Sequence, residues 1–144
     1  MLSEKSKKYK NVHRLLKVRK THSGLGMVTL EPIEKGGFVI EYVGTILNKE
    51  QADKRAGKYL FETSKNRFID GSDRSNTARY LNHSCKPNCE VEIKGGHVLI
   101  FAKRAIKAGE ELEYDYGKEY FDEFIVGYGC RCGAKKHLYG IKKE

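Results

Sequence analysis

The chain has 144 residues, of which 39% are hydrophobic and 33% are charged, and its formal net charge is +9. This length suits one domain with a single core, and the composition excludes an intrinsically disordered chain. No apolar run approaches the roughly 20 residues that cross a bilayer, and the N-terminus lacks the apolar stretch of a secretory signal. We therefore expect an intracellular protein, in the nucleus on chromatin or in the cytoplasm, with no membrane segment. Its four cysteines are then thiols or metal ligands rather than disulfides.

The charge is unevenly spread along the chain. Residues 1–20 carry eight lysines and arginines and residues 131–144 carry five, whereas residues 109–123 carry seven acids against one lysine. Basic ends attract nucleic acid or another polyanion, and an acidic segment attracts a cationic ligand. Each cluster taken alone is also typical of a solvated surface.

Short apolar or alternating runs, separated by Gly, Asn, Asp and Lys, predict many short strands. In chain order they are Leu15–Val18, Met27–Leu30, Phe38–Val43, Tyr59–Glu62, Arg67–Asp70, Cys89–Ile93, Val98–Ala102 and Glu111–Tyr114. Asn48 and Gln51 form a capping-box pattern that begins a helix, and Gly57 can end it. A shorter helical turn is expected from Asn76 to Leu81. The predicted fold class is mostly β with short helices.

Two kinds of turn are indicated by glycines. Lys94-Gly95-Gly96 lies between two predicted strands and favours a hairpin turn, because glycine tolerates the positive φ that such turns require. The pattern Ile-x-x-Gly occurs twice, at Ile33–Gly36 and Ile106–Gly109, as a short internal repeat. Each copy leads into a predicted strand. Two copies are too few for a solenoid, so they indicate two similar turn-strand units of one domain.

Two segments before the C-terminal region carry functional groups. Ser23-Gly24-Leu25-Gly26 precedes a predicted strand and would let a ligand approach the backbone, but alone it is typical of an ordinary turn. Asn76–Asn88 (NTARYLNHSCKPN) brings a cation, an amide, an imidazole, a hydroxyl and a thiol close together in sequence. A Cys–His nucleophile pair and a polar turn are two interpretations of it. Neighbours in sequence rarely have the geometry of a nucleophile pair, and no oxyanion device is evident.

A third segment, Glu110–Gly117 (EELEYDYG), ends the predicted strands. In a strand Tyr114 and Tyr116 point to the same face. The motifs GLG, EYVG (Glu41–Gly44), RYLNHSC (Arg79–Cys85) and ELEYDY, in this order, resemble the SET domain of protein-lysine methyltransferases. The resemblance covers most of the chain, and the last two motifs as a pair are highly specific.

The resemblance implies a SET fold, with several small sheets around a threaded, pseudoknot-like C-terminal segment that passes beneath the NHSC loop. It implies a basic N-terminal extension at 1–14, a SET domain at 15–117 and a post-SET-like tail at 118–144, without a cysteine-rich pre-SET module. It also implies an enzyme that transfers methyl groups from S-adenosylmethionine to a lysine of a basic protein such as a histone. We expect a monomer whose acidic segment steers that substrate and whose basic ends contact nucleic acid.

The resemblance also implies roles for individual residues. The implied cofactor-binding residues are Gly24, Leu25, Gly26, Arg79, Asn82, His83, Tyr116 and, in the tail, Leu138. Tyr116 matches the family's catalytic tyrosine, and Tyr42 is similar to a tyrosine that lines the lysine channel. Tyr114 occupies the family's phenylalanine/tyrosine switch position, which implies mono- or dimethylation.

The resemblance finally implies a zinc site in the tail, where the family often combines the Cys of NHSC with a CxCxxxxC segment. Cys85, Cys130 and Cys132 match this pattern, but His137 stands where its last cysteine is expected. A Cys₃His set suits Zn²⁺, which accepts sulfur and imidazole ligands. Cys89 as the fourth ligand and a tail without metal are the alternatives.

Two other functions compete with the enzyme. The first is a non-catalytic SET-like module that binds basic tails or chromatin. The second, a small nucleic-acid-binding protein, rests on net charge alone and predicts a steep dependence of DNA affinity on salt. The matched motif positions are all present, which favours the enzyme.

Overall fold

The computed structural model describes residues 15–21, 24–55 and 57–117. Strands dominate this part of the chain, which confirms the predicted class, and no helix in it is long and apolar enough to span a membrane. In chain order the elements are β1 (Leu16–Thr21), β2 (Gly24–Thr29), β3 (Phe38–Tyr42), β4 (Thr45–Leu47), α2 (Lys49–Arg55), β5 (Leu60–Ser64), β6 (Arg67–Asp70), the 3₁₀ helix η1 (Thr77–Tyr80), β7 (Asn82–His83), β8 (Cys89–Lys94), β9 (His97–Ala102) and β10 (Glu111–Tyr114).

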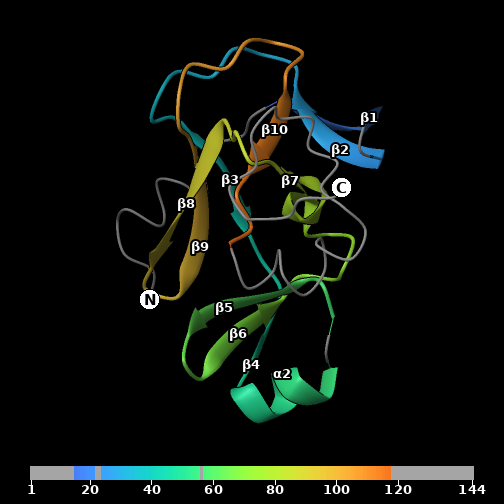
Figure 1. Cartoon of the computed structure of the whole chain (residues 1–144), viewed down its shortest axis with the longest axis vertical. Helices are drawn as coiled ribbons and strands as arrows, with labels where there is room; N and C mark the ends of the chain where they lie inside the picture. The colour runs from blue at the N-terminus through green and yellow to red at the C-terminus, as the bar shows by residue number, and fades with distance from the viewer. Residues whose placement is uncertain (1–14, 22–23, 56, 118–144) are drawn as a thin grey trace, which may run out of the picture.

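The strands form three small sheets, in the orders β1-β2-β10-β7, β3-β9-β8 and β4-β6-β5. Figure 1 shows the β4-β6-β5 sheet and α2 at one end of the molecule and the turns at 30–37 and 103–110 at the other. β10 runs antiparallel to β2 and parallel to β7. The last described strand therefore lies between two strands that precede it, and it places the tyrosine segment beside the NHSC loop.

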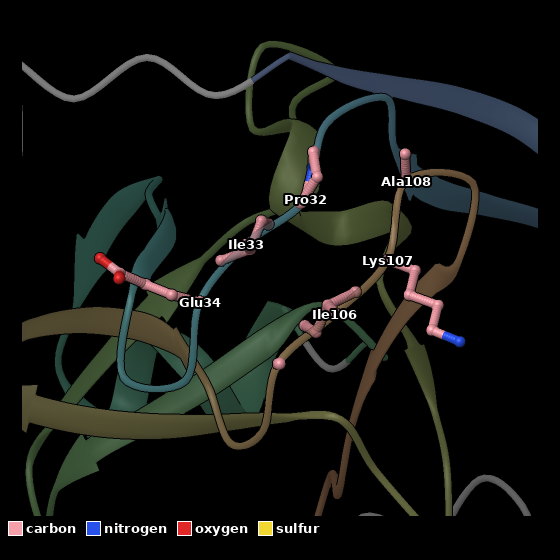
Figure 2. A pocket seen from close by; sticks show the side chains of 7 residues that line it. Pro32, Ile33, Glu34, Ile106, Lys107 and Ala108 are labelled. Carbon is pink, nitrogen blue, oxygen red and sulfur yellow. The ribbon is translucent and has the colours of Figure 1, made fainter.

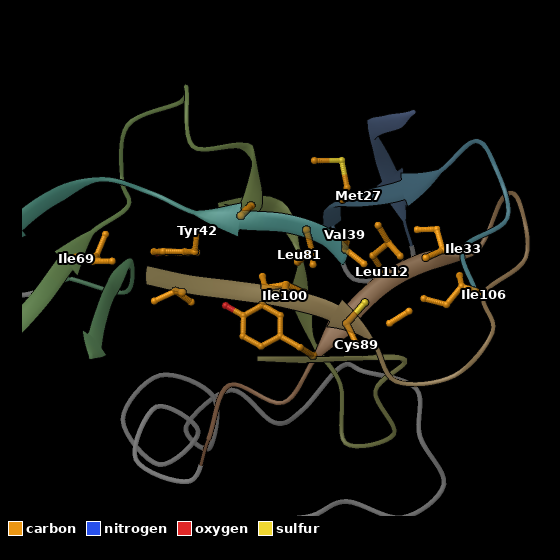
Figure 3. Close-up of a cluster of buried hydrophobic side chains, with 14 residues drawn as sticks. Met27, Ile33, Val39, Tyr42, Ile69, Leu81, Cys89, Ile100, Ile106 and Leu112 are labelled. Atoms are coloured by element: carbon orange, nitrogen blue, oxygen red, sulfur yellow. The ribbon is translucent and has the colours of Figure 1, made fainter. Parts of the chain in front are cut away.

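The core lies between the sheets and extends from the turns to the insert formed by β4, β5 and β6 (Figure 3). Alternation along β10 sends Leu112 and Tyr114 inward, at 0% and 6% exposure, while Glu111 and Glu113 face the other way. The largest apolar side chains that are fully buried are Met27, Ile33, Leu81, Ile100, Ile106, Leu112 and Val98.

The two copies of the short internal repeat form two turns that are joined by backbone hydrogen bonds. Ile33 and Ile106 exchange both backbone hydrogen bonds, at 2.9 and 2.8 Å. Gly36 and Gly109 each have positive φ, 82° and 92°, and each donates its N–H to the strand leading into the other turn. A shallow groove beside this bridge is lined by residues of both turns (Figure 2). None of the expected site residues lines it.

Local patterns predicted most elements correctly. Asn48 and Gln51 exchange the two capping-box hydrogen bonds, at 2.8 and 2.9 Å, at the start of α2. Gly95 and Gly96 have φ of 58° and 81° and form the two-residue turn between β8 and β9. The turn expected at Gly24–Gly26 was wrong, because these residues belong to β2 and pair with β1. β4 and β7 were not predicted.

Candidate active site

The NHSC loop holds the tyrosine segment through its backbone. β7 places Asn82 beside Glu113 and His83 beside Tyr114 in a parallel pair. Ser84 continues this contact, because its N–H donates to the carbonyl oxygen of Tyr114 at 3.0 Å. The two most specific motifs of the sequence therefore form one structural unit.

Tyr116 is fixed at both its backbone and its hydroxyl. Its N–H donates to Nδ1 of His83 at 3.1 Å, and its hydroxyl donates to the carbonyl oxygen of Leu81. Its ring meets the His83 ring edge-on, with centroids 5.5 Å apart, and the Tyr114 ring at 4.9 Å. A tyrosine held in this way presents its oxygen in one direction, so it suits the alignment of reacting groups better than their capture.

Asn88 is a further residue of this unit to which the sequence assigned no role. It is 5% exposed, and its side-chain amide donates to the carbonyl oxygen of Glu111 at 2.8 Å and accepts the N–H of Glu113 at 2.9 Å. One amide thus satisfies two backbone groups of β10, as a paired strand would. Its position at the end of the NTARYLNHSCKPN segment was the available signal.

The GLG residues lie directly against Asn82. Asn82 Nδ2 donates to the carbonyl oxygen of Leu25 and to Glu111 Oε2, both at 2.9 Å. A Cβ on Gly26 would come within 2.5 Å of Glu111 Oε2 and 3.0 Å of Asn82 Nδ2, so any larger residue would have to displace these side-chain ends. Gly24 has φ of 107° with open space beside it, and Leu25 is 58% exposed. The strand therefore offers an open backbone surface next to Asn82.

Tyr42 lies in a second group of aromatic residues. It is 4% exposed, and its hydroxyl donates to the carbonyl oxygen of Tyr59 at 2.7 Å. Its ring packs against Phe61 at a centroid distance of 5.3 Å. Tyr59 was not among the expected site residues, because a tyrosine beside a short β run is equally typical of packing.

Arg79 belongs to this second group. Its guanidinium lies over the Tyr59 ring at 4.4 Å and the Tyr80 ring at 5.3 Å, and Nη1 donates to the carbonyl oxygen of Ser72. The hydrogen bond with Tyr59 raises the pKa of Arg79 above its usual range. Nε is buried and has no hydrogen-bond partner. A buried, unpaired N–H on a cation suits an anionic ligand group such as a carboxylate.

The acidic segment carries less free charge in its described part than its sequence suggests. Glu110 is paired with Arg104 at 2.8 Å. Burial, with a smaller effect of Glu111, raises the pKa of Glu113 to about 8, and Oε2 of Glu113 is buried without a partner. Glu113 therefore keeps its proton near neutral pH.

Of the expected zinc ligands, only Cys85 lies within the described residues; Cys130, Cys132 and His137, like the tail residue Leu138, lie outside them. Cys85 is buried, with Sγ 3.4 Å from His83 Nε2. Because His83 Nδ1 accepts the Tyr116 N–H, the ring proton is on Nε2 and faces this sulfur. Residues 15–21, 24–55 and 57–117 contain no group of three or more potential metal ligands.

Cys89, the rival fourth ligand, has a different environment. It is 1% exposed, and burial raises the pKa of its thiol to about 12. A thiol binds a metal as its thiolate, so a metal at Cys89 would have to displace a proton that burial helps to retain. Burial therefore counts against Cys89 as the fourth ligand, and His137, its rival for that position, lies outside the described residues.

Comparison with known proteins agrees with this geometry. Residues 24–117 match the SET domain model. The chain is 42% identical over 125 residues to the Drosophila virilis histone-lysine N-methyltransferase trithorax, covering 78% of this chain and 3% of that protein. It is 36% identical over 138 residues to the Arabidopsis thaliana histone-lysine N-methyltransferase ASHH3, covering 87% of this chain and 37% of that protein. For human histone-lysine N-methyltransferase 2D the identity is 38% over 123 residues, covering 77% of this chain and 2% of that protein.

The chain thus spans between 2% and 37% of these relatives' length. The residues that match the SET domain model contain the GLG strand, the NHSC loop and the tyrosine segment. The chain belongs to the SET-domain family.

Proposed function

We propose that this chain transfers methyl groups from S-adenosylmethionine to a lysine side chain of a basic protein, with histones as the first candidates. One observation carries the proposal: Tyr116 is fixed by Leu81 and His83 in the same unit in which Asn82 meets the GLG strand. The relatives named histone-lysine N-methyltransferases support the reaction and the substrate class. Such an enzyme would act in the nucleus, on chromatin. Transfer of labelled methyl groups to core histones tests the proposal.

The residues present fit the charged groups of this cofactor. The carbonyl oxygen of Leu25 and the carboxylate of Glu111 are acceptors suited to an ammonium group, and Arg79 Nε is a donor suited to a carboxylate. When bound, S-adenosylmethionine supplies an activated methyl group on a sulfonium. Gly24, Leu25, Gly26, Asn82 and His83 would hold it, with Arg79 and Tyr59 at a second contact.

The chain's own residues then have to prepare the lysine. A free lysine has a pKa of about 10.4, so its ammonium must lose a proton before it can attack. A buried, largely apolar surface such as that around Tyr42 and Tyr114 lowers a lysine pKa by disfavouring the charged form. Water takes the proton, and Tyr116, with its hydroxyl proton engaged by Leu81, aligns the neutral amine through its oxygen.

Tyr114 is proposed to limit the reaction to mono- or dimethylation. It is 6% exposed and contacts the Tyr116 ring, so its hydroxyl occupies space that a more methylated amine would need. Replacing Tyr114 with phenylalanine is expected to shift the products toward trimethyllysine. Intact-mass measurement of a lysine substrate checks this, and dominant trimethylation by the wild type, unchanged in the variant, contradicts it.

We also propose one zinc ion in the tail, held by Cys85, Cys130, Cys132 and His137. The Nε2–H of His83 that faces Cys85 would stabilise a thiolate there, whereas the raised pKa of Cys89 disfavours one. Purified full chain is expected to contain zinc at one ion per molecule, by elemental analysis. His137→Ala should lose it and Cys89→Ala should keep it. Metal-free wild type, or zinc loss in Cys89→Ala alone, is the contrary result.

A further inference from the structure

Tyr42 is enclosed by a closed ring of hydrogen bonds. The carbonyl oxygen of Tyr59 accepts both the Tyr42 hydroxyl, at 2.7 Å, and the Gly71 N–H, at 2.9 Å. The carbonyl oxygen of Gly71 accepts Asn76 Nδ2 at 3.0 Å. Asn76 Oδ1 in turn accepts the N–H of Val43, the residue after Tyr42, at 3.0 Å. Within this ring of hydrogen bonds, Asn76 contributes both groups of its side-chain amide, the Nδ2 donor and the Oδ1 acceptor.

The residues that form this ring of hydrogen bonds are tightly packed. Asn76 is 1% exposed and Tyr42 is 4% exposed. A Cβ placed on Gly71 would collide with the Tyr42 ring and with Asn76 Nδ2, so the glycine backbone lies directly against both. In such tight packing a change in the Asn76 side chain has to move its neighbours. The Tyr42 ring is one of these neighbours, because it and Asn76 Nδ2 lie against the same face of Gly71.

Asn76 also forms a backbone hydrogen bond with Arg79, the cation that lies over the Tyr59 ring. The carbonyl oxygen of Asn76 accepts the N–H of Arg79 at 3.1 Å, as the first turn of η1. The Arg79 guanidinium lies over the Tyr59 ring. The backbone carbonyl oxygen of the same Tyr59 accepts the hydrogen bond from the Tyr42 hydroxyl. One buried residue therefore connects the segments that carry Tyr42, Tyr59 and Arg79.

We propose that Asn76 is a positioning residue that acts through Tyr42, holding the phenol against Tyr59 so that it forms a fixed wall for the lysine. The inference rests on the proposed methyl transfer and goes beyond it, since it assigns a role to a residue outside the matched site residues. A merely structural asparagine would stabilise the fold without any specific energetic coupling to the Tyr42 hydroxyl.

A double-mutant cycle separates these roles. Asn76→Asp keeps the acceptor for Val43 N–H but replaces the donor to Gly71 with a second acceptor. We expect kcat to fall about 100-fold in Asn76→Asp, because small misplacements at a reacting centre cost about that much. We expect kcat to fall about 10-fold in Tyr42→Phe. Because the two residues are coupled, kcat of the double variant should fall about 100-fold, whereas independent effects would multiply to about 1,000-fold. Additive losses would overturn the inference.

A second readout does not need activity. The buried Tyr42 hydroxyl should give a slowly exchanging proton resonance by NMR in the wild type, and Asn76→Asp should lose it. Asn66→Asp is the matched control, because exposed Asn66 also accepts a backbone N–H, from Lys49 at 2.9 Å, within the same insert. A hydroxyl resonance that persists in Asn76→Asp would overturn the positioning role. Absence of methyl transfer in the wild type would instead count against the proposed function, while the resonance still decides the role of Asn76.

Discussion

Replacing Tyr116 with phenylalanine is expected to lower kcat for methyl transfer by about 100-fold to 1,000-fold. The substitution removes the oxygen that aligns the amine and also the donor to the carbonyl oxygen of Leu81. The ring contacts with His83 and Tyr114 remain, so the packing around the phenyl ring is kept. Single-turnover kinetics with labelled cofactor measures the change.

Cofactor binding serves as the control for this variant. The cofactor contacts proposed at Leu25, Asn82 and Glu111 are joined by hydrogen bonds of Asn82 that do not involve the Tyr116 hydroxyl. Affinity for S-adenosylmethionine, measured by calorimetry, should therefore change by less than about threefold, or about 0.6 kcal/mol. A Tyr116→Phe variant with the wild-type kcat would show that the Tyr116 hydroxyl takes no part in the reaction.

Replacing Gly44 with alanine is expected to destabilise the protein by about 3 kcal/mol. A Cβ at this position would overlap the carbonyl group of Asp70 and approach Gly71 Cα, and these are backbone atoms that cannot rotate away. Relief would require β4 and β6 to separate at the Thr45–Asp70 pair. The midpoint of urea denaturation, followed by circular dichroism, gives the loss.

Gly57→Ala is the matched control, because a Cβ at Gly57 would have no neighbour within 4 Å. Its stability should stay within about 0.5 kcal/mol of the wild type. Equal stability of both alanine variants would contradict the close contact at Gly44.

Local sequence patterns predicted the elements whose cause is local. Arg67–Asp70 and Glu111–Tyr114 form strands with the predicted bounds, and the Gly95-Gly96 turn has the positive φ that favours glycine. β7 could not be predicted this way, because two residues become a strand only when β10 pairs with them. β4 is equally short and depends on β6. Both strands are consequences of tertiary packing.

The site was predicted through motifs, and its supporting residues were not. Asn76 and Asn88 each use one side-chain amide to satisfy two backbone groups, and all of these groups except the Gly71 carbonyl lie more than 20 residues away in sequence. Nothing in a local pattern reveals such a partner. For the same reason a local pattern does not reveal the contact between His97 and Glu41, whose Nδ1 and Oε2 lie 2.8 Å apart across β3 and β9. The environment of Arg79 could not be predicted either, because its guanidinium contacts Tyr59, Tyr80 and the carbonyl of Ser72.

The most direct test of the methyltransferase assignment is transfer of labelled methyl groups from S-adenosylmethionine by the purified full chain to a panel of core histones and other basic proteins. The account predicts labelling of a lysine in at least one histone by the wild type, and labelling reduced by about 100-fold or more with Tyr116→Phe. No labelling of any protein, or equal labelling by the variant, would contradict it and favour a SET-like module that only binds basic tails.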